Sequence, residues 1–203
     1  MIVFIALVAS ACESYAAATE LGPEALKETL DKLAPPQSEH GFTIPFKEAR
    51  SFPFRRYPKN FEGKVYAAAD GQLAIVYSFP SSYRIIISGD QIELIYDDGE
   101  TRDLSGEAGL HVFTDLLKWD TEAISQNWPT SSVNEQDGRY YVTLVPIDST
   151  LAKSIKELSF QFDDQRVFSV SIKQRDGVGR KYEFGPAVPM DLGDPEIREV
   201  FSR

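Results

Sequence analysis

The chain has few of the residues and motifs on which most enzymes depend. Its 203 residues include one cysteine and two histidines, so no disulfide can form within the chain. The sequence contains no G-x-S-x-G, H-E-x-x-H, C-x-x-C or Walker segment, which are the patterns of common hydrolases, metal sites and nucleotide sites. We therefore expect a protein that is not an enzyme and needs no metal or cofactor, with a hydrolase as the lesser alternative.

The few candidate polar sites have simpler interpretations. His40 lies in a polar linker and is interpreted as a solvated loop residue. His111 precedes Asp115 by four residues on an expected helix, where such a pair is usually a surface pair. The run from Asp97 to Glu100 lacks the spaced oxygen ligands of a calcium loop and is typical of a hairpin turn. None of them is predicted to be catalytic or metal-binding.

Positive charge is also scarce. Lys and Arg total 21 against 31 Asp and Glu, for a net charge of −10. Nucleic-acid binding depends on clustered cations that release counterions from phosphates, and the one basic cluster, Arg55, Arg56 and Lys59, is small. The sequence therefore predicts no nucleic-acid partner. With 42% apolar residues, the chain is long enough for one well-packed domain, and we expect a monomer.

The first 18 residues differ from the rest. Ile2–Ala9 is an apolar run that is too short to span a bilayer, and Ala16–Ala18 fits the A-x-A pattern of a signal-peptidase site. Lys and Arg are absent before the run, although signal peptides usually begin with positive charge. We expect residues 1–18 to be a signal peptide and residues 19–203 the mature domain, with a buried N-terminal strand or helix as the alternative.

The single cysteine allows a second kind of processing. Ala9–Cys12 loosely resembles a lipobox, in which the cysteine is acylated and becomes the first residue. Two localisations follow: a soluble periplasmic protein cleaved after Ala18, or an outer-membrane lipoprotein anchored through Cys12. The soluble form would retain no cysteine, which suits an oxidising compartment.

The order of expected elements is helix, strands, helices, strands. Pro23–Leu33 has an apolar stripe of Leu26, Leu30 and Leu33 at helical spacing, and Pro35 ends it. Strands with frequent turn signals fill 42–104 and return over 140–145, 158–162, 167–172 and 181–184. Between them, Leu110, Phe113, Leu116 and Leu117 predict a second helix, and 121–128 a third. The tail from Pro186 is expected to hold at most a short polar helix. This order is typical of a single α+β domain with an antiparallel sheet.

Several expected strands are more apolar than a half-wet sheet needs. Leu73–Tyr77 is apolar at every position, as is Ile85–Ile87, whereas a strand with one wet face alternates. A broad apolar face with two or three short helices to cover it favours a curved sheet around a cavity. The alternative, which composition alone favours, is a sheet that curls tightly and fills its own core.

The order of several segments resembles the LolA-like outer-membrane lipoprotein carriers, in particular a divergent branch of them. The resemblance covers about Leu26 to Phe184. It rests on the following segments: Phe46-Lys47-Glu48-Ala49-Arg50, Gly63 at a strand start, Leu73–Pro80, Tyr83–Ile92, Tyr96–Gly99, Tyr141–Pro146 and Ile155–Phe162. None of these motifs is catalytic, and it is their order that carries the resemblance.

The resemblance implies a fold and a function. Members of the family have a single open, strongly curved antiparallel sheet, or half-barrel, with helices as a lid over its concave face. Their cavity takes the acyl chains of a lipidated protein from an inner-membrane donor to an outer-membrane acceptor. In this chain it implies a lid of Leu26, Leu30 and Leu33. The expected cavity residues are Leu73, Ile75, Tyr77, Ile85, Ile87, Phe160 and Phe162.

The sequence also departs from the family. Better-known carriers hold the lid with an arginine in an early strand, and no arginine occurs at the corresponding place, Ala68–Asp70. The cargo is therefore open between a lipidated protein and another envelope lipid. Glu48 and Arg50 are expected either to form a cross-strand ion pair or to orient a lipid head group. The alternative function is an anchored lipoprotein, acylated at Cys12, with a structural or lipid-accepting role.

Overall fold

The computed structural model describes residues 19–21, 23–32, 39–106, 120–128, 130–136, 139–147, 149–162, 166–191 and 195–201. Residues 1–18, and with them the expected signal peptide and Cys12, lie outside this set. So do Leu33 and the expected second helix around Leu110 to Leu117.

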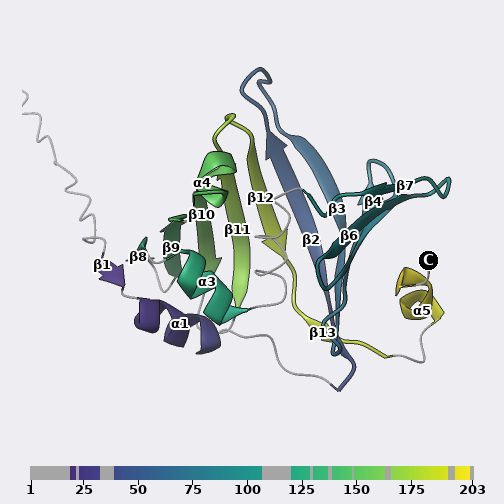
Figure 1. The fold of residues 1–203 in the computed structure, drawn as a ribbon, viewed down its shortest axis with the longest axis horizontal. Helices are drawn as coiled ribbons and strands as arrows, with labels where there is room; N and C mark the ends of the chain where they lie inside the picture. Colours follow the sequence, from purple (N-terminus) through teal and green to yellow (C-terminus); the bar gives the residue numbers. More distant parts are fainter. Residues whose placement is uncertain are drawn as a thin grey trace, which may run out of the picture.

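The first half of the chain is a short helix followed by a run of strands (Figure 1). Its elements are β1 (Thr19–Leu21), α1 (Pro23–Lys32), β2 (Gly41–Ser51), β3 (Lys59–Ala68), β4 (Leu73–Phe79), β5 (Tyr83–Ser88), β6 (Gln91–Tyr96) and β7 (Thr101–Asp103). The second half continues with α3 (Thr121–Asn127), β8 (Thr130–Gln136), β9 (Arg139–Val145), α4 (Leu151–Ser154), β10 (Ile155–Phe162), β11 (Val167–Gln174), β12 (Gly179–Phe184), β13 (Val188–Pro189) and α5 (Pro195–Phe201).

All the described strands belong to one antiparallel sheet. The order is β1-β8-β9-β10-β11-β12-β2-β3-β4-β5-β6-β7, with β13 added beside β2. The two end strands, β1 and β7, pair with inner neighbours and not with each other, so the sheet is open. Figure 1 shows β10 to β12 upright and β4 to β7 sweeping to the right, so the sheet turns strongly along its width. The predicted open antiparallel sheet is confirmed, whereas the cover of helices over its concave face stays a prediction.

The expected strands and the short helix at 121–128 form, but four elements were not expected: β1, β8, α4 and β13. Strand β8 has the sequence TSSVNEQ, which lacks the apolar alternation that identifies a strand. It is paired on both sides, by β1 and by β9, so its conformation comes from its neighbours. The turn of helix α4 and the two-residue strand β13 are likewise too short to leave a pattern in the sequence.

The sheet has two apolar faces in its β2–β5 region. One carries the large cluster: Leu30, Phe46, Phe61, Val65, Ala67, Leu73, Ile75, Tyr77, Ile85, Ile87, Ile92, Leu94, Leu104, Ile124, Trp128, Val142, Leu144, Ile155, Leu158, Phe160, Phe162, Val170, Ile172 and Tyr182. The other carries the small cluster: Tyr66, Ala74, Met190, Ile197 and Val200. Because successive side chains in a strand point to opposite faces, β4 sends Leu73 and Ile75 to the first and Ala74 to the second. The strand is apolar throughout because both of its faces are covered.

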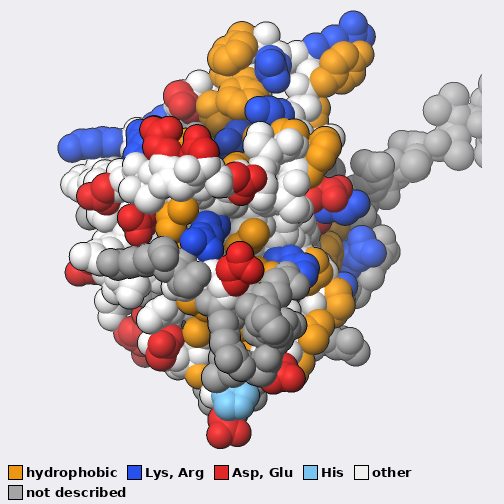
Figure 2. All heavy atoms as spheres, turned by 90° about the vertical axis from the view of Figure 1, so that its right-hand side faces the viewer, with side chains coloured by type: hydrophobic (Ala, Val, Ile, Leu, Met, Phe, Trp, Pro, Cys, Tyr) orange, Lys and Arg blue, Asp and Glu red, His pale blue; other side chains and the backbone are white. Residues whose placement is uncertain are grey.

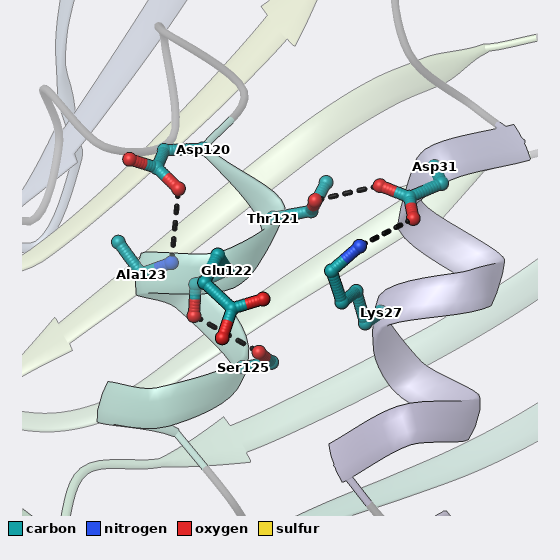
Figure 3. Close-up of polar contacts among 7 residues, drawn as sticks. All are labelled: Lys27, Asp31, Asp120, Thr121, Glu122, Ala123 and Ser125. Atoms are coloured by element: carbon teal, nitrogen blue, oxygen red, sulfur yellow. Dashed lines mark hydrogen bonds and ion pairs between the residues drawn. The ribbon is translucent and has the colours of Figure 1, made fainter.

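Helices α1 and α3 contact each other beside the large cluster (Figure 3). The Thr121 hydroxyl donates a hydrogen bond of 2.6 Å to Asp31 Oδ1, and Lys27 Nζ donates one of 2.8 Å to Asp31 Oδ2. Asp120 caps α3 by accepting a hydrogen bond from the Ala123 amide at 2.9 Å. The two short helices are thus joined through one carboxylate, Asp31, whose pKa is lowered by the hydrogen bond from Lys27 and then by that from Thr121.

Helix α5 covers the small cluster on the opposite face. Ile197 and Val200 are buried against β4, and Met190 joins them from the preceding segment. The Arg84 guanidinium, on β5, donates to the Glu199 carbonyl at 2.8 Å, near the C-terminal end of the helix. A short helix thus forms in the tail, as allowed for, but it is amphipathic and not polar; it is too short for its apolar stripe to stand out in the sequence.

A candidate apolar binding face with a polar end

The seven residues expected to line a cavity lie together in the large cluster. Their exposed fractions run from 0% for Phe160 to 8% for Ile85. Strand pairing explains part of this arrangement, since Leu73 lies opposite Ile87 and Ile75 opposite Ile85 in the β4–β5 ladder. Phe160 and Phe162, on β10, belong to the same cluster. In the sheet, β11, β12, β2 and β3 lie between β10 and β4. The structure therefore brings all seven to one buried apolar face.

Of the three expected lid residues, the structure describes one side chain. Leu30 on α1 is fully buried, with 0% exposure, in the large cluster; Leu33 and the side chain of Leu26 lie outside the described set. Ile124 and Trp128, on α3 and at its C-terminal cap, reach the same cluster. Sequence reasoning missed these two, although their i, i+4 spacing in an expected helix was the signal that would have found them.

A buried ion pair lies at one end of this face. Arg50 Nε and Nη2 each donate a hydrogen bond of 2.9 Å to the Glu48 carboxylate, whose side chain is 0% exposed. The Tyr77 hydroxyl donates a third, also of 2.9 Å. The expected Glu48–Arg50 pair therefore forms, but within β2 and not across strands, because residues two apart in a strand share a face.

Two buried tyrosines adjoin this pair. Burial raises the pKa of the Tyr182 hydroxyl to about 12, and the nearby negative charge of Glu48 adds to the effect. Burial also raises the pKa of Tyr77 well above its ordinary value, with further contributions from Tyr182 and Glu48. Both hydroxyls therefore stay protonated at neutral pH and are available as hydrogen-bond donors.

A row of cations crosses three strands beside Glu48. Arg180 on β12 lies directly opposite Arg50 on β2, and Arg50 lies directly opposite Lys59 on β3. The Arg50 guanidinium carbon is 4.3 Å, and Lys59 Nζ 5.1 Å, from the ring centroid of Phe61, a member of the large cluster. The row therefore lies on the same face as the apolar residues. Sequence reasoning singled out Arg50 as a candidate site residue, named Lys59 only as part of a small basic cluster, and missed Arg180.

The side chain of Arg180 is hydrogen-bonded to Tyr182 but keeps one unsatisfied donor. Its Nε is buried and has no hydrogen-bond partner among the residues that the structure describes. Burial acts to lower the pKa of Arg180, but the neighbouring Tyr182 and Glu48 outweigh it and leave the pKa above its ordinary value. The guanidinium is thus a fixed, partly desolvated charge.

The other face of the sheet carries two adjoining grooves. A groove of about 560 Å³ runs over β2, β3 and β12 and is lined by residues that include Lys47 and Lys64. A second, of about 490 Å³, lies between β4–β7 and α5. The two share Tyr66 and Val76. Charged side chains line both, so neither is as apolar as the large cluster.

The tip of the β2–β3 hairpin exposes aromatic and basic side chains together. Phe54 is 83% and Tyr57 71% exposed, and the Arg56 guanidinium carbon lies 5.5 Å from the Tyr57 ring centroid. Figure 2 shows hydrophobic and basic side chains gathered at the top of the molecule, where Figure 1 places this hairpin. The small basic cluster seen in the sequence is thus part of an exposed tip.

Within the described ranges, no three His, Cys, Asp or Glu side chains come together as they would around a metal ion. A separate search of the same ranges finds no helix with both the length and the apolar character needed to cross a membrane.

Comparisons with known proteins give likeness at the level of the fold. No family model matches the sequence, and no curated protein matches it. Among solved structures, a LolA superfamily protein from Nitrosomonas europaea has 10% identity and a TM-score of 0.47, over 90% of this chain and 98% of that one. An outer-membrane lipoprotein-sorting domain from Vibrio parahaemolyticus, described as putative, has 8% identity and a TM-score of 0.45, over 88% and 97%.

A DUF1329 family protein from Desulfovibrio piger is similar too, with 10% identity and a TM-score of 0.46 over 86% of this chain and 94% of that one. At 8–10% identity the likeness concerns the fold alone, and the ligands and partners of those proteins stay their own.

Proposed function

We propose that this protein is a periplasmic carrier that binds acyl chains of a lipid or lipidated protein on the large-cluster face and moves them across the cell envelope. The observation that supports this most is the convergence of the seven expected residues, from β4, β5 and β10, on one buried apolar face. The sequence resemblance to lipoprotein carriers points the same way. The cargo would come from an inner-membrane donor and pass to an outer-membrane acceptor.

Helices α1 and α3 act as the lid in this proposal, over the concave side of the curved sheet. Three of their described side chains, Leu30, Ile124 and Trp128, enter the large cluster. Burying a side chain of this size contributes about 2–3 kcal/mol, whereas a long acyl chain at about 0.8 kcal/mol per CH₂ contributes on the order of 10 kcal/mol before ordering costs. An acyl chain can therefore offset the displacement of these three side chains.

The link between the helices makes them a single moving element. Asp31 on α1 accepts hydrogen bonds from Lys27 of the same helix and from Thr121 of α3. These contacts are on the exposed side of the helices, so they need not break when the pair lifts from the sheet. The proposed motion is a hinge of α1 and α3 together.

The test is ligand-dependent stability. A ligand that binds the folded state alone raises its stability by about 2.7 kcal/mol at one hundred times the dissociation constant, so a long-chain fatty acid should raise the Tm of the parent. Phe160→Ala, in the large cluster, should weaken this shift. Ile197→Ala, in the small cluster, should lower the starting Tm but keep the shift.

The proposal is wrong if the parent shows no ligand-induced shift and carries no lipid when purified from its native envelope and extracted for mass spectrometry. The large cluster would then be a core that the protein fills by itself.

The alternative is a lipoprotein anchored through an acylated Cys12. The Ala9–Cys12 segment favours it, and the intact mass of the exported protein separates the two forms. Cleavage after Ala18 supports the soluble carrier, and a diacylated Cys12 the anchored protein.

A further inference from the structure

We propose that Arg180, Arg50 and Lys59 form a head-group site that selects amphiphiles with an anionic head, a carboxylate or a phosphate. This inference rests on the proposed function, because it assumes that an acyl chain lies on the large-cluster face. It goes beyond it in naming the class of ligand and the residues that would recognise the head.

The row of cations carries more positive charge than its neighbours balance. Three cations lie directly opposite one another on β12, β2 and β3, and like charges in such positions repel. Among the residues that the structure describes, the row has one ion pair, that of Arg50 with Glu48. Three positive charges against one negative charge leave two in excess, in a chain whose net charge is −10. An anion placed beside Arg180 would offset this repulsion.

The two arginines of the row differ in how many of their hydrogen-bond donors are already used. Arg50 already uses Nε and Nη2 on the Glu48 carboxylate, so its main role is to hold that carboxylate. Arg180 has a buried Nε with no partner in the described part of the chain. A guanidinium presents its donors in a planar fork that matches a carboxylate or phosphate. Arg180 is therefore the residue best placed to bind the head, with Lys59 as a second charge.

The row of cations directly adjoins apolar side chains of the large cluster. Following the ladder pairs across the sheet, Leu144 lies opposite Leu158, Leu158 opposite Ile172, and Ile172 opposite Arg180. All three apolar side chains are buried in the large cluster. One row of the sheet thus passes directly from apolar side chains to the cations. A ligand with a long apolar chain and an anionic head fits this order.

The experiment compares ligands that share one chain and differ in their head. A saturated fatty acid, its alcohol and the corresponding lysophosphatidic acid are titrated against the parent protein, with displacement of a fluorescent acyl probe as the readout. We expect the two anionic ligands to bind at least about tenfold more tightly than the alcohol, and this preference to fall as salt rises. Comparison of the acid with the phosphate identifies which anion the site favours.

Two variants and one matched control locate the effect. Arg180→Gln should remove most of the preference for anionic heads and leave alcohol binding unchanged. Lys59→Gln, at the exposed end of the row, should reduce the preference partly, and it is informative even if Arg180→Gln does not fold. Lys181→Gln removes one positive charge from the opposite face of β12, where Lys181 pairs with Glu183 at 2.8 Å, and should change nothing.

Equal binding of the acid and the alcohol by the parent would overturn the head-group site while leaving the acyl carrier intact. A preference that survives in folded Arg180→Gln and in Lys59→Gln would overturn the assignment of these residues. If none of the three ligands displaces the probe, or if the probe itself does not bind, the proposed function fails and the head-group site fails with it.

Discussion

The two faces of strand β4 are both apolar, but they are built differently. On one, Leu73, Ile75 and Tyr77 join a cluster that extends over most of the sheet and also takes in α1 and α3. On the other, Ala74 meets a cluster of five buried residues under α5. The first is broad, and only a few side chains of α1 and α3 are described in it; the second is narrow, and one helix with Met190 fills it. This difference is why we place a ligand on the first face and a purely structural role on the second.

The polar groups differ between the faces as well. The large-cluster face ends in a buried carboxylate, Glu48, with Arg50 and Tyr77 bonded to it. The small-cluster face has Arg84 at its rim, where the guanidinium bonds the carbonyls of α5. One set of polar groups adjoins the apolar face on which we propose that a ligand binds, and the other fastens a helix in place.

The largest effect on stability should come from the centre of the large cluster. Phe160→Ala removes an aromatic ring from a site with 0% exposure, and such changes cost about 3–5 kcal/mol. Denaturant unfolding at neutral pH measures the loss. A loss below about 1 kcal/mol would mean that the face tolerates empty space, contrary to a tightly packed ligand-free state.

A smaller effect is expected on the second face. Ile197→Ala should cost about 2 kcal/mol, the lower end for this change, because the small cluster has few members and can relax around the gap. The same unfolding experiment gives the comparison directly. If Ile197→Ala costs as much as Phe160→Ala, the two faces contribute equally and the distinction between them is wrong.

The third prediction is that stability falls at alkaline pH because of a buried tyrosine on the large-cluster face. The folded state raises the pKa of Tyr182 from 10.0 to about 12, so it binds the hydroxyl proton more tightly than the unfolded state does. Its contribution to stability is therefore complete below pH 10 and is lost as pH rises through about 12. Chemical unfolding at a series of pH values in the parent and in Tyr182→Phe measures this, and the variant should show a shallower decline.

The smallest effect should come from the hydrogen bond that links helices α1 and α3. Thr121→Val removes the hydrogen bond to Asp31, on the exposed side of α1 and α3, and should lower the Tm less than either core substitution does. Acyl-probe affinity should stay close to that of the parent, because Leu30 and Ile124 are untouched. A loss of affinity as large as that of Phe160→Ala would show that the link itself holds the binding-competent form.

Much of the fold was predictable because its strands carry their own patterns. Leu73, Ile75 and Tyr77 share a parity that already placed them on one face, and turns at Gly71 and Gly89, where φ is +87° and +58°, mark the strand ends. Strand β8 was not predictable, because its polar sequence forms a strand only between β1 and β9. The covering of Ala74 by Ile197 and Val200 was not predictable either, since it joins segments more than 100 residues apart.

The candidate site, like the fold, was predictable from the sequence only in part. The seven apolar residues were identified from their shared parity and bulk together with the family resemblance, and a sequence motif drew attention to Glu48 and Arg50. The place of Arg180 and Lys59 in the row was missed because it depends on register: each lies opposite Arg50 only when β12, β2 and β3 are aligned as in the structure. A single sequence does not contain that alignment, so a row of charges across strands cannot be read from it.

The most direct test of the proposed function is to determine which face of the sheet an acyl chain contacts. The chain has two tryptophans, Trp119 and Trp128, and Trp128 is buried in the large cluster with 2% exposure. Trp119→Phe therefore leaves a single reporter on that face. For the other face, Phe201→Trp is added to a chain in which both native tryptophans are phenylalanine, since Phe201 packs against the small cluster.

Both proteins are titrated with a fatty acid brominated along its chain, which quenches tryptophan at short range, and with the unbrominated acid as the control. We expect the brominated acid, but not the control acid, to quench the fluorescence of Trp128 in a saturable way. The fluorescence of the reporter at position 201 should not be quenched. Quenching of the second reporter with Trp128 unaffected, or equal quenching of both, would contradict the central claim that the large-cluster face is where the acyl chain binds.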